Sequence, residues 1–338
     1  MSRILVLCGG DNSERRVSLA SGDAVSKGLT EAGHDVLKLD TSFPETVVDG
    51  LTPLLEGPVG TTPPDEQNAV RMDTAKWQQL TQSILNSNVD AVFPILHGSW
   101  GEDGHIQGWL DLLNVPYLGS GMIASSRAMD KHTSRLYASI LGLPVAEGFF
   151  ITDEAPIDEV KSLVRDDLGF PVVVKPNHGG SSADLIIANN EEEVVQGVIN
   201  IRKSGDDVLI EEFIDGCELT VSMLDGSPLP VIEIAPKDGF YDYTNKYTHG
   251  KTEYICPAPI DPEIARHAQE MSEQIYEQIG CRHLARVDWR LNKDNDLFFL
   301  EVNTIPGMTS LSLVPMAAKA VGVDFPGLMD RFVKMVIG

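Results

Sequence analysis

Three oxygen-bearing side chains near the end of the chain have the chemistry of a metal–nucleotide site. Asp288, Glu301 and Asn303 offer two carboxylates and one amide. Hard oxygen ligands of this kind suit Mg²⁺, which usually shares its coordination shell with substrate phosphates. Glu301 and Asn303 are two residues apart on an apolar run that is typical of a strand, so they point to the same face. Asp288 ends a second strand-like run, and two neighbouring strands could present all three side chains together.

A fixed positive charge accompanies these ligands. Arg286 lies two residues before Asp288 and therefore shares a face with that carboxylate. The plainer alternative is a salt bridge at the end of a strand. We favour the metal–nucleotide site, because the rest of the chain holds further residues suited to phosphates.

The composition is that of a large globular protein with a strong acidic bias. A length of 338 residues predicts two or three domains. With 50 acidic and 26 basic residues, the formal net charge is −24. This charge argues against binding the phosphate backbone of nucleic acid but leaves room for a local phosphate pocket. No apolar run is long enough to cross a membrane and no signal leads the N-terminus, so we expect no membrane partner.

The cysteines indicate in which cellular compartment the protein is expected. Cys8, Cys217, Cys256 and Cys281 lack metal-ligand spacing, and two of them lie in apolar runs. They are interpreted as reduced thiols, and we therefore expect a cytoplasmic protein.

The first part of the chain predicts an α/β domain. A strand over 4–8 leads into a glycine turn, and a helix capped at Ser13 should run to Leu29. Further strands are expected over 36–39 and 89–96. Alternation of strands and helices favours a parallel sheet whose ligands gather at the carboxyl ends of the strands. Gly9-Gly10 and His97-Gly98 lie at two such ends.

The remainder predicts two α+β domains, which makes the fold class three-domain α/β. We place an N-terminal parallel-sheet domain at 1–118, a central domain at 119–211 and a C-terminal domain at 212–338. The stretch 50–67, rich in Pro, Gly and Thr, is expected on the surface.

A glycine- and serine-rich loop follows the predicted strand that ends at Lys175. In Gly179-Gly180-Ser181-Ser182 the glycines let backbone N–H groups approach phosphates, and the serines add donors. The loop is not a Walker A motif, and a plain hairpin turn is the alternative. Lys131 and Lys175 could neutralise phosphates as point charges, although lone lysines are surface residues by default.

Other polar residues suggest the rest of a nucleotide site. Glu211 and Glu218 could accept hydrogen bonds from adenine and ribose, or be two solvated acids. Lys246 lies in the aromatic segment 241–247, which suits either a lid over phosphates or a simple packed loop. His97 is more often structural, but its glycine-rich surroundings favour a site.

In this order the motifs resemble the D-alanine–D-alanine ligases of the ATP-grasp superfamily, over nearly the whole chain. The matching segments are Gly9-Gly10 with Ser13-Glu14-Arg15; His97-Gly98 with Gly101-Glu102-Asp103-Gly104; Gly119-Ser120-Gly121; Met129-Asp130-Lys131; Lys175-Pro176 with Gly180-Ser181-Ser182; Tyr241-Asp242-Tyr243 with Lys246-Tyr247; Arg286 with Asp288; and Glu301 through Thr309 to Ser312-Leu313. The resemblance implies a three-domain ATP-grasp fold in which the second and third domains clamp ATP. Residues 45–76 resemble a segment that is added relative to the shorter members of the family.

The resemblance also implies a reaction. The carboxylate of a first D-alanine would attack the γ-phosphate of ATP to give an acyl phosphate and ADP. The amine of a second D-alanine would then expel phosphate and form D-alanyl-D-alanine for peptidoglycan precursors. Asp288, Glu301 and Asn303 would hold two Mg²⁺ ions, for which Mn²⁺ can substitute.

The resemblance assigns further roles by position. Lys131, Lys175, Ser181, Ser182, Glu211, Glu218 and Lys246 would bind ATP. Arg286 and the Gly307 backbone would stabilise the tetrahedral oxyanion. Glu14 and His97 would bind the first substrate, and Ser312 with the Leu313 amide would bind the second. Glu14, Ser181 and Tyr247 would form a hydrogen-bonded set that closes the lid. The family also implies a homodimer.

Substrate choice and the phosphate loop leave alternatives open. Tyr247 is replaced in related ligases that make D-alanyl-D-lactate, so its presence here implies an amino acid as the second substrate. The loop departs from the family at Gly179, Ala183 and Asp184, and Glu212 and Leu311 depart elsewhere. The alternatives are a ligase for another amino-acid pair and a nucleotide-binding protein without ligase activity.

Overall fold

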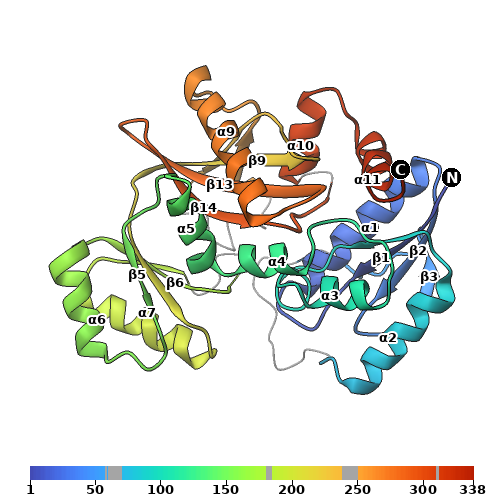
Figure 1. Cartoon of the computed structure of the whole chain (residues 1–338), viewed down its shortest axis with the longest axis horizontal. Helices are drawn as coiled ribbons and strands as arrows, with labels where there is room; N and C mark the ends of the chain where they lie inside the picture. The colour runs from blue at the N-terminus through green and yellow to red at the C-terminus, as the bar shows by residue number, and fades with distance from the viewer. Residues whose placement is uncertain (58, 60–70, 180–184, 238–249, 310–311) are drawn as a thin grey trace.

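Three β-sheets lie along the molecule, one in each third of the chain (Figure 1). The computed structural model describes residues 1–57, 59, 71–179, 185–237, 250–309 and 312–338. The mixed α/β architecture predicted from the sequence is confirmed.

The first sheet has the order β3-β2-β1-β4. Its strands are β1 (Arg3–Cys8), β2 (Asp35–Asp40), β3 (Val47–Asp49) and β4 (Ala91–Pro94). β1 pairs in parallel with β2 and β4, as predicted, and β3 is antiparallel. Helices α2 (Thr74–Ser87) and α3 (His105–Leu112) pack on one face, and α1 (Arg15–Glu31) and α11 (Phe325–Ile337) pack on the other.

The start of α1 differs from the prediction by one residue. Glu14, not Ser13, is the N-cap residue, and its side chain does not cap the helix. The Asn12 side chain accepts a hydrogen bond from the Glu14 backbone N–H at 2.9 Å. This local Asx turn delays the helix, so that Glu14 is the N-cap residue and Arg15 the first helical residue.

The second sheet is antiparallel, with the order β5-β8-β6-β7. Its strands are β5 (Gly148–Ile151), β6 (Val172–Pro176), β7 (Ile186–Ala188) and β8 (Val208–Glu212). Helices α6 (Ile157–Leu163) and α7 (Glu191–Lys203) cover it with their own apolar cluster. A π-helical turn, Val164–Leu168, continues α6. This lobe stands apart at one end of the molecule (Figure 1).

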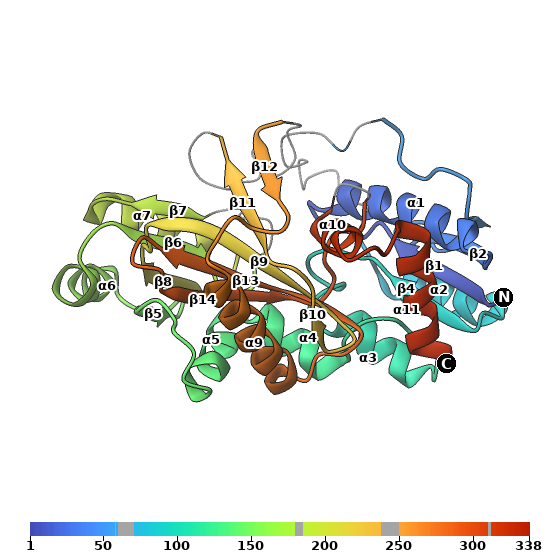
Figure 2. The ribbon, with the colours of Figure 1, turned by 90° about the horizontal axis from the view of Figure 1, so that it is seen from above.

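The third sheet carries the predicted metal ligands. Its order is β12-β11-β9-β13-β14, with β10 beside β9. The strands are β9 (Gly216–Leu224), β10 (Ser227–Pro228), β11 (Ile232–Pro236), β12 (Thr252–Ile255), β13 (Leu284–Asn292) and β14 (Leu297–Asn303). Seen from above, β11 and β12 rise from the rest of the sheet as an arm (Figure 2).

Two pairs of helices pack against a sheet that lies in a different predicted domain. Helices α4 (Met122–Met129) and α5 (Lys131–Ile140) share an apolar core with the third sheet and α9 (Pro262–Ile279). Helices α10 (Leu313–Ala320) and α11 share the core of the first sheet. The loop from Thr304 to Thr309 therefore runs from the third sheet back to the first, and the two termini lie at the same end of the molecule (Figure 1).

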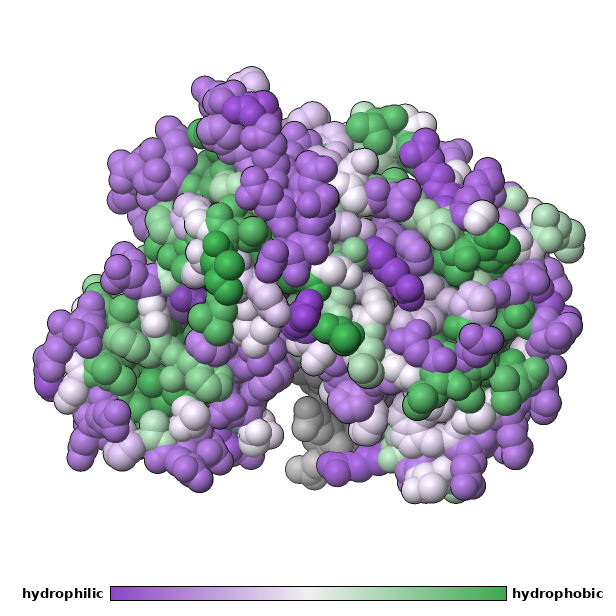
Figure 3. Space-filling model, in the orientation of Figure 1, coloured by the Kyte–Doolittle hydropathy of each residue, from purple (hydrophilic) through white to green (hydrophobic). Residues whose placement is uncertain are grey.

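The surface of the molecule is indented between the lobe of α6 and α7 and the part that carries α2 and α3 (Figure 3). Among the described helices, none is long and apolar enough to cross a bilayer.

Candidate active site

Two antiparallel strands bring the predicted metal ligands together. On β13 and β14, Asp288 pairs with Glu301 and Arg286 pairs with Asn303. Asp288 and Arg286 are buried, with 3% and 9% of their surfaces exposed. Directly opposite residues of an antiparallel pair lie on the same face about 5 Å apart. The predicted convergence of Asp288, Glu301 and Asn303 is confirmed as geometry.

Strand β13 does not end at Asp288 as predicted. It continues to Asn292, because β9 pairs with it from Leu284 to Asn292 and the following hairpin holds it in place. A register shift follows Asp288, between that residue and Trp289. Bulges of this kind are over-represented next to active sites, where they re-aim side chains.

The Asp288 carboxylate has two fixed partners. Arg286 donates to both of its oxygens, at 2.9 Å from Nε to Oδ1 and 2.7 Å from Nη2 to Oδ2. The Thr220 hydroxyl on β9 donates to Oδ1 at 2.6 Å. Thr220 was not predicted, although it lies two residues after Glu218 and so shares its face. These bonds orient the carboxylate on the face that it shares with Glu301.

Three carboxylates, those of Glu218, Asp288 and Glu301, lie among three cations, Arg286, Arg290 and Lys131. Glu218, on β9, has its pKa raised to about 7, chiefly by burial. Repulsion from Asp288 and Glu301 adds to the rise, and Arg290 opposes it. Glu218 lies 4.0 Å from Arg290 between their closest charged atoms. A divalent cation would relieve this repulsion.

The donor set fits Mg²⁺ better than a metal that needs a preformed protein cage. Among the described residues, no three His, Cys, Asp or Glu side chains form such a group. Two carboxylates and an amide are the usual protein share of a Mg²⁺ site, which substrate phosphates and water complete. The Ser222 hydroxyl, opposite Arg286, is buried without a hydrogen-bond partner in the described structure.

Lys131 connects the metal ligands to the predicted phosphate loop. Its Nζ lies 3.4 Å from Glu301 Oε2 and donates to the carbonyl of Gly179. The Lys131 backbone N–H donates to Asn177 at 3.1 Å. This position between the loop and Glu301 suits the role in phosphate binding that the sequence analysis gives Lys131, which stays a prediction.

His178 ties the start of this loop to two carboxylates. Its Nδ1 lies 2.7 Å from Asp206 Oδ1, and its Nε2 lies 3.6 Å from Asp130 Oδ2. The hydrogen bond to Asp206 raises the pKa of His178. Hydrogen bonds, including one from His178, lower the pKa of Asp206 in spite of its burial. The cluster therefore holds the loop most firmly when His178 is protonated.

Steric crowding explains why position 179 holds a glycine. A Cβ there would lie 2.4 Å from Pro176 Cγ, too close for any side chain. The departure noted at Gly179 therefore fits the local backbone of this chain.

Gly179→Ala should therefore lower the free energy of unfolding by about 1–3 kcal/mol, because the Cβ forces the loop and Pro176 apart. Gly179→Glu should cost at least as much, because it adds the same Cβ. Chemical denaturation of the two variants beside the parent chain measures this. If the alanine variant is as stable as the parent, the steric explanation is wrong.

Lys175 and Glu211 form a buried triad with Arg135. Glu211 is 4% exposed, and its Oε2 lies 2.5 Å from Lys175 Nζ. Arg135 donates to the other carboxylate oxygen and, at 2.5 Å, to the Ala146 carbonyl. Arg135 was not predicted, although it lies four residues after Lys131 and thus on the same face of α5. The triad orients Lys175 through Glu211.

Arg135→Met should lower the free energy of unfolding by about 3 kcal/mol or more, because it leaves Glu211 buried with half of its balancing charge. Urea denaturation measures the loss. Arg165→Met is the matched control, because Arg165 is exposed and, among the described residues, pairs with the surface acids Asp166 and Glu191. Equal behaviour of the two variants would contradict the structural role of the triad.

The predicted first-substrate residues meet at the carboxyl ends of the parallel strands. Glu14 is 9% exposed, and a Cβ on Gly98 would lie 3.2 Å from its Oε2. Asn12 bonds to the His97 carbonyl at 2.8 Å and thereby joins the two strand ends. Glu14 and His97 thus line the same edge of the first sheet, as predicted.

Ser21 links this edge to the loop that carries Gly307. Its hydroxyl lies 3.4 Å from His97 Nε2 and 3.4 Å from the Met308 backbone nitrogen. The Ser312 hydroxyl accepts from the Thr309 N–H at 2.9 Å and would be 3.3 Å from a Cβ on Gly307. Leu313 begins α10, where backbone N–H groups favour a carboxylate.

Four predicted site residues lie outside the described residues: Ser181, Ser182, Lys246 and Tyr247. The departures Ala183, Asp184 and Leu311 do so as well.

The three sheets and their clamp-like arrangement define an ATP-grasp fold. Family models for the N-terminus and the C-terminus of D-Ala–D-Ala ligases match residues 3–120 and 138–334. The chain is 38% identical over 329 residues to the D-alanine–D-alanine ligase of Syntrophotalea carbinolica, covering 97% of this chain and 94% of that one. It is also 38% identical to that of Aquifex aeolicus, covering 97% and 98%. The chain belongs to the D-alanine–D-alanine ligase family.

Solved structures agree with this assignment. The D-alanine–D-alanine ligase from Bacillus anthracis in complex with ATP has a TM-score of 0.76 at 29% identity, covering 99% of this chain and 97% of that one. The VanG D-Ala:D-Ser ligase from Enterococcus faecalis has a TM-score of 0.78 at 26% identity, covering 99% of each chain.

Proposed function

We propose that this protein joins two D-alanines at the expense of ATP and makes D-alanyl-D-alanine for peptidoglycan synthesis. The observation that carries the proposal is the cross-strand set of Arg286, Asp288, Glu301 and Asn303, with Lys131 beside it. A purely structural protein has no need for buried like charges of this kind.

The first step forms an acyl phosphate. Glu14 and His97 hold the first D-alanine at the strand ends, with Glu14 pairing with its ammonium group. The carboxylate of this first D-alanine attacks the γ-phosphate of ATP, and ADP leaves. Lys131 and Lys175 neutralise the phosphates, with Lys246, Ser181 and Ser182 as further contacts. Glu211 and Glu218 bind the nucleoside, and the transfer depends mainly on positioning and charge.

The second step forms the peptide bond. Ser312 and the Leu313 N–H hold the carboxylate of the second D-alanine, and its amine attacks the acyl carbon. Negative charge then develops on the carbonyl oxygen, where Arg286 and the Gly307 backbone stabilise it before phosphate leaves. Glu14 would act with Ser181 and Tyr247, which lie outside the described residues, to exclude water from the acyl phosphate.

Asp288, Glu301 and Asn303 would hold two Mg²⁺ ions, for which Mn²⁺ can substitute. These ions would supply charge neutralisation and alignment of the ATP phosphates.

Release of ADP tests the function directly. With Mg·ATP, D-alanine alone should give rapid release, and the dipeptide should appear by mass spectrometry. L-alanine and the absence of substrate should give little. Measurable ATP binding without D-alanine-dependent release would point to a nucleotide-binding protein without ligase activity.

A second amino-acid pair is favoured by one likeness, that to the D-Ala:D-Ser ligase. D-Serine and D-lactate, each mixed with D-alanine, therefore belong in the same assay. Tyr247→Phe should admit D-lactate if the lid residue controls the choice of the second substrate. An unchanged product spectrum would count against that role.

We also propose a cytoplasmic homodimer, by family resemblance. Exposed apolar side chains on neighbouring helices suit such an interface: Leu112 on α3, Met122 and Ile123 on α4, and Leu136 and Ile140 on α5. Light scattering should give twice the mass of the chain, and Ile140→Asp should lower it. A parent chain that scatters as a monomer would contradict the proposal.

A further inference from the structure

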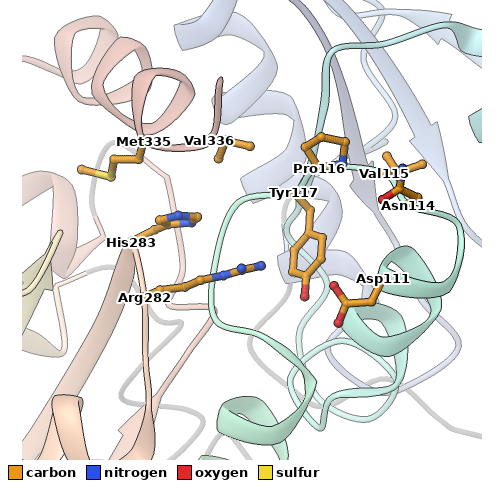
Figure 4. A pocket seen from close by; sticks show the side chains of 9 residues that line it. All are labelled: Asp111, Asn114, Val115, Pro116, Tyr117, Arg282, His283, Met335 and Val336. Atoms are coloured by element: carbon orange, nitrogen blue, oxygen red, sulfur yellow. The ribbon is translucent and has the colours of Figure 1, made fainter. Parts of the chain in front are cut away.

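A cavity of about 300 Å³ lies at a three-way junction away from the residues assigned above (Figure 4). One wall is the segment that follows α3, another is the turn before β13, and the third is the end of α11. Nine residues line it: Asp111, Asn114, Val115, Pro116, Tyr117, Arg282, His283, Met335 and Val336. Its volume is at the lower end of the range of about 300–1,000 Å³ found for small-molecule sites.

Two opposite charges face this cavity without neutralising each other. Among the described residues, neither Asp111 nor Arg282 forms an ion pair. The aromatic ring of Tyr117 lies between them (Figure 4). The Arg282 guanidinium carbon lies 4.8 Å from the centre of that ring, and its Nε donates to the Gly119 carbonyl at 2.8 Å. The ring and the backbone therefore hold the cation in place, with its remaining N–H groups available to an anion.

His283 supplies a neutral donor beside the cation. Its Nδ1 accepts a hydrogen bond from the Gly119 N–H at 3.2 Å, which assigns the proton to Nε2. Burial and the nearby Arg282 lower the pKa of His283, so the ring stays neutral near pH 7. An Nε2–H group can donate to a carboxylate without a competing charge change.

The buried Tyr117 hydroxyl in the cavity wall interacts with Asp111. Tyr117 is 4% exposed, and its hydroxyl forms a loose hydrogen bond with Asp111. That hydroxyl ends beside the Asp111 carboxylate (Figure 4). Burial raises the pKa of Tyr117 to about 12, so the phenol stays protonated. The protonated phenol therefore donates to Asp111 and helps to hold that carboxylate at the cavity wall.

We propose that this cavity binds a small zwitterion, with its ammonium group on Asp111 and its carboxylate on Arg282 and His283. Free α-amino acids and dipeptides both have this chemistry, and the length of the ligand decides between them. Binding would join the first sheet to the turn that precedes Arg286 by four residues, and so would brace the junction between the sheets. The site is separate from the catalytic residues, and the inference does not depend on their roles.

Methionine methyl groups provide a local test. The chain has 10 methionines. Met335 lines the cavity, whereas Met308 follows Gly307 in the candidate active site. The full chain, labelled with ¹³C at the methionine methyls and assigned through Met335→Leu and Met308→Leu, is titrated with glycine and with glycylglycine. Acetate and methylammonium, which carry one charge each, are the controls. A response of Met308 reports on the active site alone, so the two sites are judged separately.

We expect a saturable shift of the Met335 signal with one or both zwitterions, at about millimolar affinity because both charges are exposed. D111N and R282Q should each weaken binding about tenfold, and R331Q, which removes an exposed charge outside the cavity, should not. D111N leaves the Arg282 contact with Gly119 intact, so it tests the site without loosening the junction. No saturable Met335 shift, an equal shift with acetate, or full affinity in D111N would overturn the proposal.

Discussion

Arg286→Ala should reduce D-alanine-dependent ADP release by about a hundredfold or more, because it removes the cation that stabilises charge on the reacting carbonyl. Arg286 is buried beside Asp288. A water molecule that fills the space left by its side chain cannot supply the missing positive charge. The decrease should appear in kcat rather than in KM for ATP, since the interaction strengthens only as charge develops.

Structural damage must be separated from lost chemistry in this variant. Removing Arg286 also leaves the Asp288 carboxylate buried with fewer partners, which by itself lowers stability. Arg286→Lys keeps the charge but loses the two-pronged contact, so it should fold well and still turn over slowly. Arg266→Ala, which removes an exposed arginine of α9, is the control. Unchanged turnover in a folded Arg286→Ala variant would contradict the role of Arg286 in stabilising the oxyanion.

Asp288→Asn should abolish the dependence of activity and stability on Mg²⁺. The amide keeps the shape and the contact with Thr220 but removes a charge that a divalent ion needs. Turnover should fall by about two to three orders of magnitude at the Mg²⁺ concentration that saturates the parent chain. Initial rates across a Mg²⁺ titration measure the change.

A thermal measurement makes the metal assignment independent of turnover. Mg·ADP should raise the Tm of the parent chain, because it binds the folded state alone. In Asp288→Asn, ADP should give the same small rise with or without Mg²⁺. Glu270→Gln, on the exposed face of α9, should respond like the parent. A full Mg²⁺-dependent rise in Asp288→Asn would place the metal elsewhere.

The strand face that carries the predicted metal ligands could be predicted, because it depends on local periodicity. Alternation along one strand sends Glu301 and Asn303 to one face, and it does the same for Arg286 and Asp288. The parallel first sheet was predictable for a similar reason, since apolar strands alternate with helical periods there. Glu14 was placed by family motif, and its one-residue shift to the N-cap came from an Asn12 contact that no periodicity reports.

The partners of the site residues could not be read in this way. Thr220 meets Asp288 across 68 residues of chain, and Arg135 meets Glu211 across 76. Both contacts depend on which strand or helix lies beside which. That order is decided by the burial of distant apolar faces against one another, and no local spacing records it.

The sequence by itself determined the chemistry of this protein: oxygen ligands on one strand face, lysines for phosphates and the ordered motifs of a ligase family. Only the tertiary structure decided that α4 and α5 pack on the third sheet, that Pro176 leaves no space for a side chain at position 179, and that Asp111 and Arg282 share a cavity. The physical reason is that side-chain type and direction are properties of a short stretch of chain. Proximity between remote stretches arises only when the whole chain packs its apolar surface.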